Sequence, residues 1–291
     1  MNSSPLIGVR TVAAVLTLGL LGACSSGMSS GAASSGSPSA VASKAAVSVA
    51  ADALLKEGEV SFCSDISAPP LEFMDASQKP VGAEVELGNA LAASLGAKAV
   101  WVNTAFSGII PALQAKQCDA ILTQLYIKPA REKVVDFVPY LNSSNTIVVK
   151  AGDTSITGID TLCGKKAAAQ TGTTAADYYK GASDTCTSKG QKALDVRMFA
   201  KDTDALQQLK LGLVDSYGTT LETAAYLMKL QPGVFAMAGE PFGAITCGIA
   251  TRKDNAAAHD ALKAALGVVK ADGTYNKILA DWNLTGDALK G

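Results

Sequence analysis

Two stretches of this chain, residues 113–119 and 209–215, follow the same plan. In each, an apolar helical segment ends in a short turn, and an aspartate then opens a strand. Each stretch also follows an earlier pair of strand and helix. This alternation predicts two α/β halves of similar construction, and we expect a ligand cleft between them.

The segment 118–140 carries the polar groups that such a cleft needs. A short buried strand begins at Asp119, and residues 123–126 form the polar segment beyond its carboxyl end, where open α/β sheets bind ligands. Pro129 suits the first position of a helical turn, which places Arg131 over the same strand end. A guanidinium is a permanent planar cation, so we expect it to bind a carboxylate.

Composition excludes several classes of function. The chain has 291 residues, 48% of them hydrophobic, and a formal net charge of −1, so it can bury two modest cores and has no basic excess for nucleic acid. Its single histidine, His259, lies among alanines and is best explained as a helix-surface residue. A single histidine argues against a His-based metal site and against a Ser-His or Cys-His catalytic pair. We also expect no catalytic residue, no metal, no cofactor and a monomeric protein.

The first residues have the pattern of a lipoprotein signal peptide, which we assign to residues 1–23. Arg10 supplies the basic part, an apolar run of about 12 residues follows, and Leu-Gly-Ala-Cys at residues 21–24 matches a lipobox. The run is shorter than the roughly 20 residues that span a bilayer. We expect cleavage before Cys24, lipid on its thiol, and a location in the cell envelope outside the cytoplasm.

Residues 24–45 are nearly all serine, glycine, alanine and proline. Such a composition cannot bury a core and behaves as a flexible tether. We expect it to hold the folded part close to the membrane, with the lipid as the only membrane contact. A low-complexity insert without a role is the alternative.

The cysteines predict at least one disulfide, because an exported protein can form them. With Cys24 lipidated an odd number remains, so at least one thiol lacks an intramolecular partner. Cys163 and Cys186 flank one strand–helix unit and are the preferred pair. Cys63, Cys118 and Cys247 give no basis for a choice.

The segment 118–140 resembles the first-lobe signature of family 3, the polar amino-acid solute-binding proteins of ABC importers. That signature reads roughly D-A-I-x-S-x-x-x-I-T-x-x-R-x-x-x-x-D-F-S-x-P-Y. The matching residues are Asp119, Ala120, Ile121, Thr123, Ile127, Arg131, Asp136, Phe137, Pro139 and Tyr140. The resemblance extends over about residues 60–282.

This resemblance implies an α/β, two-lobed, periplasmic-binding-protein-like (type II) fold with a hinge of two crossing segments. Lobe 1 would comprise residues 58–148 and 245–285, and lobe 2 residues 149–244. The implied function is to capture a small carboxylated, nitrogen-containing solute between the lobes. The implied partners are an ABC permease and its ATPase.

The resemblance also implies which residues contact the solute. Arg131 and the helix start at Thr173 and Thr174, where free backbone N–H groups gather, would grip one carboxylate; a surface arginine and an ordinary cap are the alternative. Asp65 would bind a cationic group, or cap its loop by an Asx turn. The full predicted set is Asp65, Ala68, Phe106, Thr123, Gln124, Tyr126, Arg131, Thr173, Thr174, Tyr217 and Thr220.

Several of these positions depart from the family pattern. Thr220 stands where the family has the acid that pairs with the α-ammonium, and Ala68 stands where an aromatic residue is usual. Phe106 could form an apolar wall or belong to the core. Tyr126 and Tyr217 each follow an acid-led strand, which places them near the cleft.

These departures predict that the solute is not a standard free α-amino acid. A derivatised, opine-like or quaternary amine could be held by Asp65, Tyr126 and Tyr217. Alternatively, Glu222 swings in and replaces the missing acid. Lys128 replaces a helix-capping threonine, so its ammonium group is available for another contact.

Two other functions compete with solute capture for import. A dehydratase-like enzyme on the same scaffold would need an acid or base in the cleft, with Asp65, Glu222 and Lys128 available. A sensory lipoprotein would present the solute to another receptor.

Overall fold

The computed structural model describes residues 47–50 and 52–289. The predicted signal peptide, the lipidation site at Cys24 and the whole of the tether at residues 24–45 lie outside these residues. Within the described part, no helix has the length and apolar character that crossing a bilayer requires.

The described chain alternates strands and helices. The strands are β1 (Glu59–Ser64), β2 (Ser67–Ala68), β3 (Glu72–Met74), β4 (Pro80–Val81), β5 (Lys98–Asn103), β6 (Ala120–Ile121), β7 (Val135–Lys150), β8 (Lys166–Gln170), β9 (Asp195–Phe199), β10 (Ser216–Thr220), β11 (Phe235–Met237) and β12 (Phe242–Arg252). The helices are α1 (Ala83–Ser94), α2 (Ile109–Gln114), α3 (Pro129–Glu132), α4 (Thr174–Ser188), α5 (Asp202–Lys210), α6 (Leu221–Leu230), α7 (Ala256–Ala271) and α8 (Thr274–Asp281). Short 3₁₀ turns occupy Phe106–Gly108, Ile159–Thr161 and Thr285–Asp287.

One mixed sheet, in the order β5-β1-β6-β12-β7-β10-β8-β9, runs through the described chain, and β11 adds to β7. Strands β5, β1 and β6 are parallel to one another, as are β10, β8 and β9. We call the half built on the first group the first lobe and the half built on the second group the second lobe. The two-lobed α/β fold predicted from the sequence is therefore confirmed.

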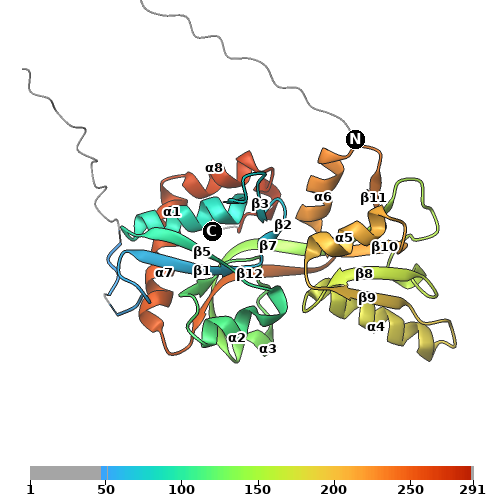
Figure 1. Ribbon diagram of the computed structural model, residues 1–291, viewed down its shortest axis with the longest axis horizontal. Coiled ribbons are helices and arrows are strands. Elements are labelled where there is room, and N and C mark those ends of the chain that lie inside the picture. Colours follow the sequence, from blue (N-terminus) through green and yellow to red (C-terminus); the bar gives the residue numbers. More distant parts are fainter. Residues whose placement is uncertain (1–46, 51, 290–291) are drawn as a thin grey trace, which may run out of the picture. The chain divides into compact units, whose positions relative to one another are not determined.

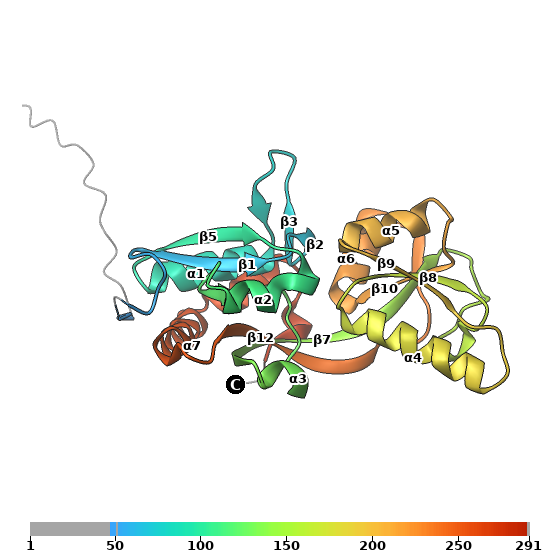
Figure 2. The same ribbon diagram turned by 60° about the horizontal axis from the view of Figure 1, so that its bottom comes forward.

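In the first lobe, helices cover both faces of the sheet. Helices α1, α7 and α8 pack on one face, and α2 packs on the other (Figures 1 and 2). The first face buries a core that includes Phe62, Leu91 and Leu262. The second face buries Ile109 and Leu113 of α2, which packs against β1 and β6.

In the second lobe, α4 covers one face of the sheet, and α5 and α6 cover the other (Figure 2). The α4 face buries Tyr179 and Leu162, and the opposite face buries Leu209 and Tyr217. Because each lobe has cores of its own on both faces of its sheet, the two can behave as separate solid bodies.

Strands β7 and β12 join the lobes. From Val135 to Asn145, β7 pairs antiparallel with β12, and from Asn145 to Lys150 it pairs with β10 and β11. The register of β7 and β12 shifts between Cys247 and Gly248, opposite Pro139. A proline has no N–H to offer a ladder, so a bulge at this point keeps both strands continuous.

Two disulfides form in the described chain. Cys163 and Cys186, the pair preferred from the sequence, are bonded at a Cα–Cα separation of 5.5 Å. Cys63 at the end of β1 is bonded to Cys118 just before β6, and Cys247 is a buried free thiol. Cys63 and Cys118 meet because β1 and β6 are neighbours in the sheet.

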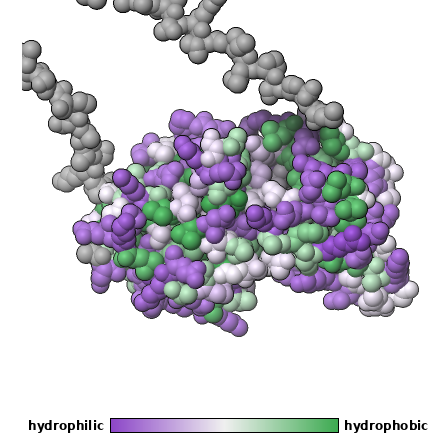
Figure 3. Space-filling model, in the orientation of Figure 1, coloured by the Kyte–Doolittle hydropathy of each residue, from purple (hydrophilic) through white to green (hydrophobic). Residues whose placement is uncertain are grey.

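The face drawn in Figure 3 is mostly hydrophilic, with apolar residues interspersed. The large apolar side chains that are exposed include Leu211, Leu213, Leu230 and Val234, which follow or end α5 and α6 of the second lobe. Most other large apolar residues lie in the cores described above.

Candidate functional site

A cavity of about 50 Å³ lies between the two lobes, beyond the carboxyl ends of β1, β6, β8 and β10. It is lined by Asp65, Ala68, Glu72, Phe106, Thr123, Gln124, Tyr126, Arg131, Asn145, Gln170, Thr173, Thr174, Ala175, Asp202, Gly218, Thr219, Thr220 and Thr223. Every residue that the sequence predicted for solute contact is in this lining, with the exception of Tyr217. The structure therefore brings polar side chains of both lobes to one small space.

A larger groove of about 630 Å³ runs along α4 and past the Cys163–Cys186 disulfide to the start of β12. It shares Thr174 with the first cavity but faces the outer side of α4. The strand-end polar groups gather in the smaller cavity, so we take that cavity as the functional site.

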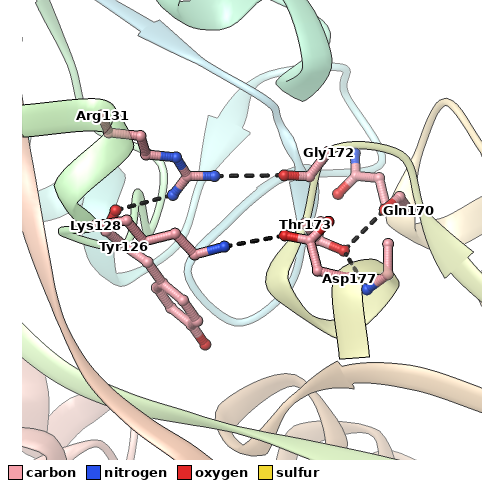
Figure 4. Close-up of polar contacts among 8 residues, drawn as sticks. Tyr126, Lys128, Arg131, Gln170, Gly172, Thr173 and Asp177 are labelled. Carbon is pink, nitrogen blue, oxygen red and sulfur yellow. Dashed lines mark hydrogen bonds and ion pairs between the residues drawn. The ribbon is translucent and has the colours of Figure 1, made fainter. Parts of the chain in front are cut away.

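Arg131 reaches from the first lobe toward the second. Its Nη1 donates to the carbonyl of Tyr126 at 2.9 Å, and its Nη2 donates across the gap to the carbonyl of Gly172 at 3.4 Å (Figure 4). The guanidinium lies 5.6 Å from the centroid of the Phe106 ring. Burial lowers the pKa of Arg131, yet a guanidinium stays protonated, so it presents a fixed cation to the cavity.

The start of α4 faces Arg131 from the second lobe. Thr173 caps this helix by accepting the N–H of Ala176 at 3.2 Å, and its hydroxyl donates to the carbonyl of Gln170 at 2.8 Å (Figure 4). Gly172 adopts a φ of +85°, which a residue with a side chain rarely does, and a Cβ there would lie 3.3 Å from Ser107 of the first lobe. Glycine thus allows the helix start to approach the first lobe closely.

Three cavity-lining atoms are buried without a hydrogen-bond partner among the residues that the structure describes. They are Thr174 Oγ1, Asn145 Nδ2 and Glu72 Oε2. For Glu72, whose pKa burial raises, the side chain of Glu84 is available as a hydrogen-bond partner, so Thr174 and Asn145 are the two groups left for a solute. Buried polar atoms normally have partners, and each one left unpaired costs about 1–3 kcal/mol. Groups of a bound solute could supply these partners.

Asp65 lies at the end of β1, as the sequence predicted. One carboxylate oxygen accepts the Ser67 hydroxyl at 2.8 Å; the other accepts the backbone N–H of Phe106 at 3.1 Å and the side-chain amide of Gln170. Burial raises the pKa of Asp65. Because Gln170 belongs to the second lobe, this acid takes part in the contact between the lobes.

Two further acids, which were not predicted from the sequence, also line the cavity. Asp202 begins α5 in the second lobe, and burial raises its pKa to about 7. Glu72 in β3 accepts the Thr123 hydroxyl at 2.8 Å, and burial raises its pKa well above the ordinary value. The cavity thus combines one cation with several carboxyl groups.

Tyr217, which the sequence predicts to contact the solute, does not line the cavity. Its side chain is fully buried in the second-lobe core, and its hydroxyl donates to Asp202 behind the cavity wall. Only the last residues of β10, from Gly218 onward, reach the carboxyl edge where the cavity lies. Tyr217 therefore supports a lining residue and does not itself line the cavity.

Glu222, considered as a replacement acid, does not line the cavity. It is buried, and it accepts the side-chain amide of Gln124 at 3.0 Å and the Ser143 hydroxyl at 3.1 Å. Thr220 caps α6 through the N–H of Thr223 at 3.4 Å. The second lobe nevertheless brings one carboxylate to the cavity, that of Asp202.

Lys128 is not among the residues that line the cavity; its ammonium pairs with Asp177 of α4 at 3.1 Å across the lobe gap (Figure 4). Its ammonium therefore joins the lobes at the edge of the site. Among the described residues, no group of three or more His, Cys, Asp or Glu side chains is arranged to hold a metal ion.

The geometry allows a solute with charges of both signs to bind. Arg131 and the amino end of α4 can hold an anionic group, and Asp65 and Asp202 can hold a cationic one. The buried lining offers hydroxyl and amide groups between them. A solute in this cavity would contact both lobes at once.

Comparison with known proteins agrees with this geometry. The family model for bacterial extracellular solute-binding proteins, family 3, matches residues 60–285. The chain is 30% identical over 231 residues to the ABC transporter arginine-binding protein 1 of Escherichia coli (strain K12), covering 77% of this chain and 90% of that protein.

Two solved structures are also similar. An ancestral arginine-binding protein bound to arginine is 35% identical with a TM-score of 0.71, covering 77% of this chain and 98% of that one. The ancestral amino acid-binding protein AncCDT-1, described as a precursor of cyclohexadienyl dehydratase, is 30% identical with a TM-score of 0.70, covering 77% and 95%.

Proposed function

Because this chain belongs to family 3 of the bacterial extracellular solute-binding proteins, we propose that it captures an amino acid or amino-acid derivative between its two lobes. It delivers this solute to an ABC permease driven by an ATPase. Lipid on Cys24 anchors it outside the cytoplasm, and residues 24–45 tether the lobes to that anchor.

One observation carries the proposal. Arg131 of the first lobe and the α4 start of the second face each other across a small cavity, where Thr174 Oγ1 is buried without a partner among the described residues. A solute carboxylate would accept bonds from both sides. Solute binding then favours the closed arrangement, because these contacts are absent when the lobes separate.

The relatives support the class of solute. The Escherichia coli relative is an arginine-binding protein, and the ancestral structure holds arginine. A cavity with one cation and several acids suits an amino acid with additional positive charge. Arginine is therefore the first solute to test.

A thermal-shift screen of the purified protein against the common amino acids, followed by calorimetry of each positive result, tests this function. We expect at least one amino acid, with arginine first, to bind with submicromolar affinity and raise the melting temperature. If no amino acid or amino-acid derivative binds, the proposal is contradicted.

A dehydratase-like enzyme is the second candidate function. It is favoured by the similarity to the precursor of cyclohexadienyl dehydratase and by Asp202, whose pKa near 7 would suit a general acid. Chromatography of a bound solute after prolonged incubation distinguishes the two functions. An unchanged solute supports the binding protein, and a dehydrated product supports the enzyme.

A further inference from the structure

Asp202 occupies an unusual place for a helix-starting acid. It is the first residue of α5, a position where a carboxylate often does no more than complement the helix dipole. Here, however, only 6% of its surface is exposed, and the side chain lines the cavity. The neighbouring Asp204, in the same helical turn, is exposed to solvent.

The partners of the Asp202 carboxylate are neutral. Tyr217 donates its hydroxyl to one oxygen, and Thr219 donates to the other at 3.4 Å. Among the described residues, no lysine, arginine or histidine forms a salt bridge with it. A buried carboxylate without a cation is costly, because no opposite charge replaces its lost hydration.

Asp65 of the first lobe is a second acid at the same end of the cavity. Ser67 connects the two, because its hydroxyl donates to Asp65 at 2.8 Å and accepts the backbone N–H of Asp202 at 3.3 Å. The negative charge of Asp65 also raises the pKa of Asp202. The two acids, one from each lobe, are thus close enough for the charge of one to oppose ionisation of the other, and a cation between them would stabilise both carboxylates.

Phe106 links this acidic end to the anion-binding end. Its ring lies beneath the Arg131 guanidinium at 5.6 Å, and its backbone N–H donates to Asp65 at 3.1 Å. A solute that places its carboxylate near Arg131 and extends along Phe106 would therefore bring its far end to Asp65 and Asp202.

We propose that Asp202 is the specificity-determining residue of the second lobe, and that it selects amino acids with a guanidinium or ammonium group at the end distant from the carboxylate. Asp65 and Asp202 together enclose this cationic group when the lobes close. The inference rests on the proposed function, since it concerns the same cavity, but it adds a residue and a charge requirement.

Arginine and citrulline form a suitable pair of probes, because citrulline has nearly the same shape and a neutral urea in place of the guanidinium. Calorimetry on the wild-type protein, on D202N and on the control D204N compares both solutes. The asparagine at 202 can still accept the Tyr217 hydroxyl, and D204N removes an equal charge from the same turn outside the cavity.

The expected results differ for the two probes. The wild-type protein binds arginine at least tenfold more tightly than citrulline. D202N loses tenfold or more in affinity for arginine, while its affinity for citrulline changes by less than threefold, and D204N resembles the wild type.

Several outcomes would overturn the inference. One is a D202N variant that binds arginine as the wild type does, and another is an equal loss for both probes, which would mark a purely structural role. Wild-type protein that does not prefer arginine to citrulline would overturn it without any variant. If the wild type then still binds another amino acid with submicromolar affinity, the proposed function stands and only the role of Asp202 falls.

Discussion

Replacing Arg131 with alanine should weaken solute binding by about 30-fold to several thousand-fold. In the structure this guanidinium donates at 2.9 Å to the carbonyl of Tyr126, which holds it in place, and only at 3.4 Å to Gly172 across the gap. The longer bond is the one that a solute carboxylate would replace with a charge-assisted, two-pronged contact.

The expected loss of affinity follows from the free energy that a buried contact between a guanidinium and a carboxylate contributes to binding. Removing one partner of a buried, hydrogen-bonded charge pair costs about 2–5 kcal/mol, and every 1.4 kcal/mol is about a factor of ten in affinity. The R131A variant also loses the stacking on Phe106, which lies 5.6 Å from the guanidinium. We therefore expect R131A to lose more than about 30-fold in affinity for the solute.

Isothermal titration of the tightest-binding amino acid into wild type, R131A and K133A measures this effect. Lys133 ends the same short helix and is exposed, so K133A removes an equal charge without touching the cavity. We expect K133A to bind within about twofold of the wild type. A folded R131A variant that binds within threefold of the wild type would refute the assignment of the carboxylate to Arg131.

Two further predictions concern stability. Burial raises the pKa of Asp202, Glu222 and Glu84 to about 7, so the folded state holds these protons more tightly than the unfolded chain does. Their stabilising effect is complete below about pH 4 and is lost as the pH rises through 7; the unliganded protein should lose on the order of 2 kcal/mol for each such group between pH 5 and 8. Melting curves across this range test the sign, E222Q should flatten the slope, and a melting temperature that rises with pH would contradict the argument. Separately, the C163S/C186S double variant opens a loop that spans a sequence separation of 23 residues and should cost about 3 kcal/mol by chain entropy. Denaturant unfolding of this variant against wild type measures the cost, and an unchanged midpoint would contradict it.

The sequence located much of the cavity because strand ends in α/β sheets are marked by local patterns. Asp65 and Thr123 follow recognisable strands, and Arg131 follows a recognisable helix start at Pro129. Because β1 and β6 are parallel neighbours, the carboxyl ends of these two strands lie together at the cavity. The two-lobed fold was predictable for the same reason.

Other features depend on packing that no local pattern reveals. Tyr217 was misplaced because it sits one residue before the part of β10 that reaches the cavity, and its side chain enters the core on the α5 and α6 face. Asp202 was missed because an acid at a helix start is ordinary, and its direction follows from how α5 packs on β8 and β10. The Cys63–Cys118 pair required knowing that β1 and β6 are adjacent.

The structure of the complex with the tightest-binding amino acid tests the central claim most directly, through the position of the solute carboxylate. We expect this carboxylate to lie between the two lobes, within hydrogen-bond distance of both the Arg131 guanidinium and the Thr174 hydroxyl. A solute carboxylate that contacts neither group, or a solute bound outside the cavity, would contradict it.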